Sequence, residues 1–218
     1  MIDLGYMAGL FPVILGYVPL TVAMAAGSMA GALVLSSILA VIRVLRVPVA
    51  HQVAGVFISF FRGTPLLVQL FLFYYGLPQA VAFFTRIDGI TAAMLGLTLH
   101  FSAYMAESLR GAILGVARDQ WEAARSVGMT EVQTMRRIIL PQAVVMSLPA
   151  LVNELILLVK ASSLVSVVGI MELTRASQAQ AATTFRPLEV YLAAACIYLA
   201  INLCLAAAGR WLEVRSAV

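Results

Sequence analysis

The sequence predicts an all-α integral membrane protein with five transmembrane helices in one domain, residues 1–218. Hydrophobic residues make up 62% of the chain and charged residues only 11%, whereas a soluble domain carries about a quarter charged residues. Uncharged stretches also recur at the length of roughly 20 residues that an apolar helix needs to cross the hydrocarbon layer. This apolar excess is more than one core of this size can bury, so membrane lipid must cover the remainder.

The first uncharged stretch, Leu4 to Ile42, is too long for one crossing and contains Pro12 and Pro19. We therefore expect the first span at about 19–42, with the preceding segment lying at the outer surface of the membrane. The other four spans are expected at about 53–76, 90–116, 138–159 and 188–211.

The distribution of basic residues predicts how the chain is oriented. Alternation of the five spans places these basic residues on one side: Arg43, Arg46, Arg118, Arg125, Arg136, Arg137, Arg210 and Arg215. The opposite side has only Arg86, Arg175 and Arg186, or one more if Lys160 is included. Because short cytoplasmic loops are enriched in Lys and Arg, we expect the N-terminus outside and the C-terminus in the cytoplasm.

Composition also argues against several classes of function. The net charge of +4 does not indicate nucleic acid, because the basic residues lie between apolar segments. His51 and His100 are isolated, so no metal site is predicted. Cys196 and Cys204 would lie about 12 Å apart on one helix, too far for a disulfide. With no serine–histidine–aspartate grouping and no GxxxxGK[ST] loop in the sequence, we expect neither enzyme activity nor a bound cofactor.

The loop between the third and fourth spans predicts two short helices that meet at a glycine. Asp119 is expected to cap the first helix, with Glu122 as its capping-box partner. Gly128 suits the left-handed position that ends this helix. Thr130 then caps the second helix together with Gln133. A helix–glycine–helix elbow is the predicted result.

Apolar side chains of this loop, residues 118–137, are expected on one face of the first short helix. Trp121, Ala124 and Val127 share that face, and Met129 lies just beyond the glycine. On amphipathicity alone, a helix lying flat on lipid headgroups is the simpler interpretation. A small apolar surface offered to a partner protein is the alternative.

The residue spacing of this loop resembles the EAA loop of bacterial ABC importer permeases. The matching positions are Glu122, Ala123, Ala124, Gly128, Ile138, Leu140 and Pro141. The resemblance implies a type I ABC importer permease fold, in which a cytoplasmic coupling helix docks into a groove of an ATPase dimer. The residues that it assigns to this contact are Trp121, Glu122, Ala123, Ala124, Gly128 and Met129. ATP and Mg would then bind to the ATPase partner and not to this chain.

Three longer strings resemble the polar amino acid uptake group of these permeases: FFRGTPLLVQLFLFYYGLP, YMAESLRGAI and LPALVNELILLVKASSLVSVVGIMELTR. The resemblance covers nearly the whole chain. It implies transport of an amino acid such as histidine, arginine, glutamine, cystine or an opine across the bacterial inner membrane. The implied partners are a cytoplasmic ABC ATPase dimer, a second permease chain that is identical or homologous, and a periplasmic or extracellular amino-acid-binding protein.

Charged residues inside membrane spans are costly and usually functional. Arg62 and Glu107 reach a similar depth, so they either form a buried ion pair or separately contact the substrate. Glu154 either binds an ammonium group or makes a hydrogen bond between helices. The candidate substrate path comprises Arg62, Thr64, Tyr104, Glu107, Asn153, Glu154, Lys160, Ser162 and Ser163.

Two places in these spans are expected to depart from regular helix. One is Thr64 with Pro65, and the other is the stretch that follows Lys160. Non-helical backbone at membrane depth is tolerated only beside protein or a water-filled cavity. Both places are therefore expected to line the path.

The strongest alternative function is a secondary transporter or channel subunit driven by an ion gradient. Glu107 and Glu154 could serve as its intramembrane carboxylates. This alternative does not account for the elbow. Co-purification with a soluble ATPase would distinguish the two functions.

Overall fold

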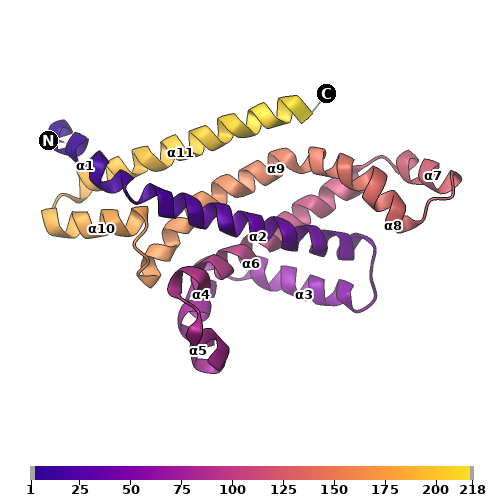
Figure 1. Ribbon diagram of the computed structural model, residues 1–218, viewed down its shortest axis with the longest axis horizontal. Coiled ribbons are helices and arrows are strands. Elements are labelled where there is room, and N and C mark those ends of the chain that lie inside the picture. The colour runs from indigo at the N-terminus through magenta and orange to yellow at the C-terminus, as the bar shows by residue number, and fades with distance from the viewer. Residues whose placement is uncertain (1–2, 217–218) are drawn as a thin grey trace.

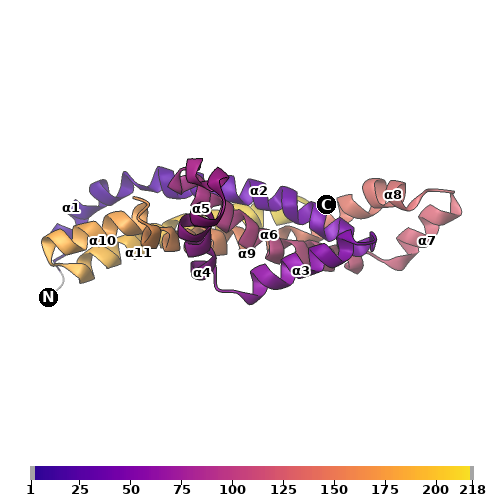
Figure 2. The same ribbon diagram turned by 90° about the horizontal axis from the view of Figure 1, so that it is seen from below.

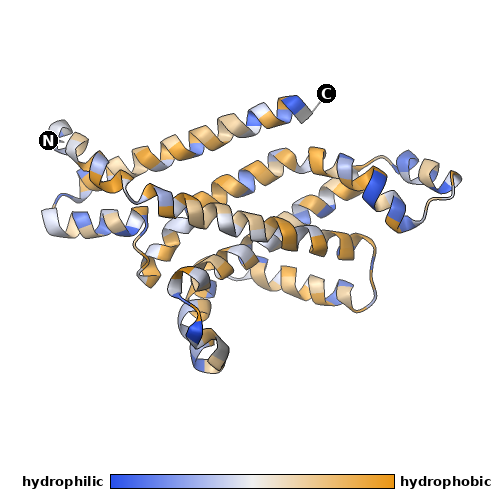
Figure 3. Cartoon of the chain, viewed as in Figure 1, coloured by the Kyte–Doolittle hydropathy of each residue, from blue (hydrophilic) through white to orange (hydrophobic). Residues whose placement is uncertain are grey.

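The computed structural model describes residues 3–216, and every regular element within that range is helical. Four helices there are long and apolar enough to cross a membrane, and a bent pair of shorter helices makes a fifth candidate. The predicted all-α membrane fold is therefore confirmed. The long helices run beside one another in an elongated bundle, and most of their residues are hydrophobic (Figures 1 and 3).

The first long helix begins after a separate short one. Helix α1 (Leu4–Leu15) is followed by α2 (Val18–Val44), which covers the expected first span, 19–42. Pro19 lies in the first turn of α2. Its missing N–H costs no hydrogen bond there, because the first N–H groups of a helix have no partner within the helix.

The second expected span, 53–76, is not one continuous helix. Helix α3 (Ala50–Gly63) and the segment that starts with α4 (Leu66–Phe71) are bent by 107° relative to each other. Thr64 and Pro65 between them are extended, with ψ angles of 145° and 135°. Proline lacks the N–H for a helical hydrogen bond and pushes the residue before it out of the helical region. The break is therefore much sharper than the local weakening expected at this position.

After α4 the chain forms an arm beside the bundle. Its elements are the π-helix η1 (Leu72–Gly76), the single turn α5 (Leu77–Ala80) and the 3-10 helix η2 (Ala82–Arg86). Figure 1 shows this arm below the long helices, and in Figure 2, which is seen from below, it lies in front of them. We refer to residues 72–86 as the arm.

Helix α6 (Gly89–Gly115) matches the third expected span, 90–116, and packs along α2. The two backbones approach closely because Gly31 of α2 faces Thr98. A Cβ atom at position 31 would lie 2.9 Å from Thr98 Cγ2. Ser28 also donates a hydrogen bond to the backbone oxygen of Met94 at 3.4 Å. Small residues on α2 thus set the spacing of this central helix pair.

The elbow and the fourth span follow. The elements are α7 (Arg118–Ser126), α8 (Glu131–Thr134), the π-helix η3 (Met135–Ile139), α9 (Leu140–Ala161) and the 3-10 helix η4 (Ser162–Val168). From α8 to η4 the chain forms one continuous helical stretch of 38 residues. It extends beyond both ends of the expected span, 138–159.

Helix α10 (Leu173–Thr184) was not expected from the sequence, whereas α11 (Pro187–Ser216) covers the expected span 188–211. Because the sequence of α10 is polar, a search for apolar spans does not identify it. Its buried Leu173 and Ala181 pack with residues of α1 and α11. These three elements meet at the end of the molecule opposite α7 and α8 (Figures 1 and 2).

Candidate functional site

We refer to α7, α8 and the residues between them as the elbow. It projects from one end of the bundle (Figures 1 and 2). Asp119 was expected to cap α7, but the N-cap is Ala117, and Asp119 lies in the first turn without a side-chain cap hydrogen bond. A carboxylate in the first turn still interacts favourably with the helix dipole. The predicted Asp119 cap is therefore wrong, although the helix is where it was expected.

Gly128 ends α7 in the left-handed conformation, as predicted, with a φ of +78°. The N–H of Gly128 donates to the backbone oxygen of Arg125 at 2.9 Å, and that of Met129 donates to Ala124 at 3.1 Å. This pair of hydrogen bonds is a Schellman motif. No heavy atom lies within 4 Å of a Cβ built on Gly128. Glycine is favoured here by backbone conformation and not by lack of space.

The second half of the elbow starts with the predicted capping box. The N–H of Gln133 donates to Thr130 Oγ1 at 3.3 Å, and the N–H of Thr130 donates to Gln133 Oε1 at 2.9 Å. The two hydrogen bonds satisfy N–H groups that have no partner within the helix. Both sides of the turn at Gly128 are thus held by local hydrogen bonds.

The apolar face expected on α7 is divided between the bundle and the exterior. Ala124 is only 1% exposed, and Trp121 is half-buried against the main hydrophobic cluster. Val127, by contrast, is 76% exposed, and Glu122 and Ala123 are exposed as well. Ala124 and Trp121 therefore pack the elbow against the bundle of its own chain. The exposed residues Glu122, Ala123 and Val127 form the outer surface of the elbow.

Of the two alternatives for Arg62 and Glu107, the ion pair between them is not formed. Glu107 Oε2 instead accepts two hydrogen bonds from Arg110 on the same helix, from Nε at 3.0 Å and Nη2 at 2.7 Å. The Arg62 guanidinium lies over the ring of Tyr104, 5.4 Å from its centroid. Tyr104 also donates a hydrogen bond to the Arg62 backbone oxygen at 3.4 Å. An arginine one turn away satisfies Glu107 more readily than one on another helix.

Glu154 is half-buried and makes no hydrogen bond or ion pair with any residue in the described range 3–216. The hydrogen bond between helices considered for it is therefore absent from this part of the chain. Arg62 is close enough to interact with it electrostatically. Asn153 and Lys160 on the same helix are exposed.

The hydroxyl groups on the expected path bond locally. Ser162 donates to the Val159 backbone oxygen at 2.8 Å, and Ser163 donates to that of Lys160 at 2.7 Å. Both residues stand where α9 changes into the 3-10 helix η4. The α-helix therefore ends at Ala161, one residue after Lys160, but it continues as a 3-10 helix and not as the non-helical backbone that was expected.

Gln69 was missed by the sequence interpretation and holds the broken span together. Its Nε2 donates to the backbone oxygens of Phe61 and Thr64 at 3.0 and 3.1 Å and to Thr64 Oγ1 at 2.7 Å. His100 Nδ1 lies 3.0 Å from its Oε1. Because Nε2 is the donor, His100 Nδ1 must carry the proton. An amide side chain inside an apolar stretch was the available signal, since buried polar groups need partners.

Glu172 is a second missed residue, 0% exposed at the start of α10. It accepts hydrogen bonds from the N–H groups of Thr174 at 2.9 Å and Arg175 at 2.8 Å, and from the Tyr198 hydroxyl at 3.1 Å. Burial raises the pKa of the Glu172 carboxyl above its usual range, and these hydrogen bonds partly oppose the rise. This carboxylate ties α10 to α11.

Together, the apolar bundle, its broken span and its projecting elbow define a multi-span membrane protein. The chain belongs to the family of binding-protein-dependent transport system inner membrane components, whose model matches residues 32–218. The predicted membership of the ABC importer permeases is thereby confirmed.

Relatives cover almost the whole chain. The "probable amino-acid ABC transporter permease protein PatM" of Vibrio harveyi is 49% identical over 213 residues, covering 98% of this chain and 96% of the relative. The glutamine transport system permease protein GlnP of Escherichia coli is 40% identical over 187 residues, covering 86% and 85%. The octopine transport system permease protein OccM of Rhizobium meliloti is 41% identical over 199 residues, covering 88% and 81%.

Solved structures agree with the fold. A chain of an amino acid ABC transporter crystallised with histidines matches with a TM-score of 0.89 and 35% identity, covering 99% of each chain. An inward-facing form of the MetNI methionine ABC transporter matches with a TM-score of 0.82, covering 95% of this chain and 98% of that chain. At 20% identity, the second match shows the shared fold alone.

Proposed function

We propose that this chain forms part of the pore that moves a polar amino acid across the bacterial inner membrane, driven by ATP hydrolysis in a separate ATPase dimer. The projecting elbow carries this proposal, because a permease without its own nucleotide site needs a surface that receives motion from an ATPase. Relatives named as amino-acid, glutamine and octopine permeases support the substrate class. An ion-gradient-driven carrier is the alternative, but such a carrier needs no surface that contacts an ATPase, so it does not explain the elbow.

Four residues of the elbow would contact the ATPase: Glu122, Ala123, Gly128 and Met129. The first three are exposed, so they are accessible to a partner. Trp121 and Ala124, which the EAA resemblance also assigns to the contact, would act by seating α7 on the bundle. ATP and Mg would bind to the partner, and this chain would act as a transport component without enzyme activity.

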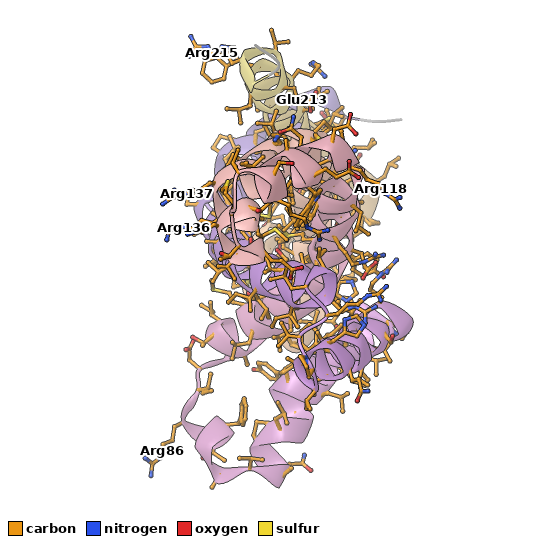
Figure 4. All side chains as sticks on the ribbon, turned by 90° about the vertical axis from the view of Figure 1, so that its right-hand side faces the viewer. Arg86, Arg118, Arg136, Arg137, Glu213 and Arg215 are labelled. Atoms are coloured by element: carbon orange, nitrogen blue, oxygen red, sulfur yellow. The ribbon has the colours of Figure 1, made fainter. Side chains whose placement is uncertain are left out.

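The orientation would place the elbow in the cytoplasm, with the N-terminus outside. Viewed from the elbow end, Arg118, Arg136, Arg137 and Arg215 surround the bundle (Figure 4). Arg118 belongs to α7, and Arg136 and Arg137 belong to η3 directly after α8, so their positive charge at the elbow end supports the cytoplasmic assignment. A second permease chain, identical or homologous, and an external amino-acid-binding protein would complete the importer.

The substrate would pass the surface where Arg62 and Glu154 lie within electrostatic range of each other without forming an ion pair. A free amino acid carries one carboxylate and one ammonium group. Arg62, stacked on Tyr104, would attract the carboxylate, and the unpaired Glu154 would attract the ammonium. Thr64, Glu107, Asn153, Lys160, Ser162 and Ser163 are proposed as further residues of this path.

The test is reconstitution with candidate partners encoded by the same organism. The tagged chain should co-purify with a soluble ABC ATPase, and the reconstituted complex should hydrolyse ATP faster when a binding protein loaded with one polar amino acid is added. A panel of amino acids would identify the substrate. Uptake that persists without any ATPase and follows an ion gradient would contradict the proposal.

A further inference from the structure

A basic cleft lies at the same end of the molecule as the elbow, where α2 and α6 end and α3 begins. Its volume is about 500 Å³, and it is lined by Arg43, Val44, Arg46, His51, Arg110 and Leu114. Three of these lining residues are arginines and none is acidic. Glu107 pairs with Arg110, so three positive charges are offset by one negative charge.

Hydrogen-bond donors outnumber acceptors in this cleft. Arg43 Nη1 lies 3.0 Å from His51 Nε2 and 3.4 Å from the His51 backbone oxygen. Because a guanidinium only donates, His51 Nε2 accepts and the ring proton lies on Nδ1. That Nδ1 and Arg43 Nε are both buried without a hydrogen-bond partner among the described residues. The Arg46 side chain likewise has no hydrogen bond or ion pair within residues 3–216.

An apolar stripe starts beside the cleft and runs along α3. Val49, Val53, Val56 and Phe60 are 73%, 63%, 71% and 48% exposed. Their spacing of four, three and four residues places them on one helical face. Val49 follows Arg46 by three residues, so the basic cleft lies next to the end of the stripe where α3 begins. A soluble anion would use only the cleft, whereas a phospholipid would use the cleft and the stripe together.

We propose that the cleft binds the phosphate of an anionic phospholipid whose acyl chain lies along this α3 stripe. The cleft lies where α2 leaves its apolar span, at the depth of the lipid headgroups. Arginine guanidinium groups bind phosphate oxygens in a planar, often bidentate arrangement. The bound lipid would also lie next to the elbow, because Leu114 lines both this cleft and the adjoining cleft formed with Trp121.

The experiment uses the complete permease–ATPase complex and native mass spectrometry of bound phosphatidylglycerol and phosphatidylcholine over a range of lipid concentrations. The wild-type complex should retain phosphatidylglycerol in preference to phosphatidylcholine. Arg46→Gln should raise the apparent Kd for phosphatidylglycerol about fivefold, and Arg43→Gln with Arg46→Gln roughly 25-fold. Arg46→Gln alone is the decisive variant, because Arg46 is exposed and makes no hydrogen bond or ion pair with the described residues whose loss would disturb folding.

The matched control is Arg86→Gln, an exposed arginine on the arm, which Figure 1 shows away from α7 and α8 and where Figure 4 shows Arg86 projecting from the bundle. It should leave the Kd unchanged. An equal Kd for wild type and Arg46→Gln would overturn the proposal. Displacement of phosphatidylglycerol by an equal concentration of inorganic phosphate would show a free-anion site instead. Disulfide cross-linking of Val53→Cys between two permease copies would show that protein, and not lipid, covers the stripe.

Discussion

At the scale of single residues, Gly128 determines the conformation of the elbow that is proposed to contact the ATPase. Its φ of +78° is accessible to glycine and costly for other residues. The Schellman hydrogen bonds before it and the capping box after it fix the direction in which the chain turns. One backbone angle therefore sets how α7 is presented to a partner.

Replacing Gly128 with valine is expected to reduce substrate uptake at least tenfold while the protein remains inserted in the membrane. A β-branched residue in the left-handed region costs about 1–2 kcal/mol or more, so the turn should re-form with another geometry. Uptake and membrane-inserted protein should be measured together. Gly111→Val is the control, because Gly111 is helical and its Cβ direction is open. Unchanged uptake by the Gly128 variant would count against the coupling role.

Glu172 predicts a pH dependence of stability. Because burial raises the pKa of its carboxyl in the folded state, the folded state binds its proton more tightly than the unfolded state does. The contribution of this group to the free energy of unfolding should therefore fall as pH rises from the usual glutamate pKa through the raised value. Asp3 and Asp88, whose pKa values are lowered by hydrogen bonds, contribute with the opposite sign.

The difference between wild type and Glu172→Gln isolates this contribution. Thermal unfolding in detergent, followed from about pH 5 to pH 8, should show that the variant gains stability relative to wild type as pH rises. The exposed Glu131, at the opposite end of the molecule, provides the control Glu131→Gln. A wild-type-minus-variant difference that is constant with pH would refute the assignment.

At the scale of elements, the broken span depends on a clasp made by one side chain. Gln69 bonds both sides of the bend between α3 and α4 and reaches His100 of α6. Proline chemistry explains why the helix breaks, but Gln69 explains how the freed backbone oxygens are satisfied inside the molecule. The bend and the arm that follows it are thus held at a defined angle.

Gln69→Leu is expected to lower the free energy of unfolding by about 1–3 kcal/mol, because it leaves buried backbone oxygens and His100 without their partner. The change should appear as a lower midpoint in thermal unfolding of the detergent-solubilised protein. Gln142→Leu serves as the control. Gln142 is exposed and bonds only to the backbone oxygen of Ile138, within its own helical stretch. Equal stability of the two variants would mean that the clasp is dispensable.

At the scale of the whole molecule, two exposed apolar residues mark its opposite ends. Val127 of the elbow is 76% exposed, and Phe185, between α10 and α11, is 88% exposed. The helices connecting them cross the apolar bundle lengthwise (Figure 1). The proposed orientation therefore places these two positions on different sides of the membrane.

Single cysteines at these positions test the orientation. In a chain with Cys196 and Cys204 replaced by serine, Phe185→Cys should react with a membrane-impermeant maleimide added to intact spheroplasts. Val127→Cys should react only after the membrane is permeabilised. The reverse pattern would place the elbow outside the cell and remove the basis for ATPase coupling.

Much of the architecture was predictable because lipid imposes strong and local rules. Uncharged runs predicted the helices α2, α6, α9 and α11, and turn chemistry predicted Gly128 and the Thr130 capping box. The polar helix α10 escaped notice because it does not cross the apolar layer as one continuous apolar run. The Asp119 cap was wrong because α7 begins at Arg118, one residue before Asp119, and its N-cap is Ala117, whose side chain accepts no hydrogen bond.

The sequence by itself determined that this chain is an integral membrane protein, that it carries a helix–glycine–helix elbow, and which transport family it belongs to. Only the tertiary structure decided that Arg62 lies over Tyr104 of α6, that Gln69 reaches His100 across the bend, and that Ala124 faces inward. The physical reason is the distance along the sequence over which each effect acts. Burial in lipid and backbone propensity depend on a few neighbouring residues. Partner choice among charged and polar side chains depends on distances between helices that only packing sets.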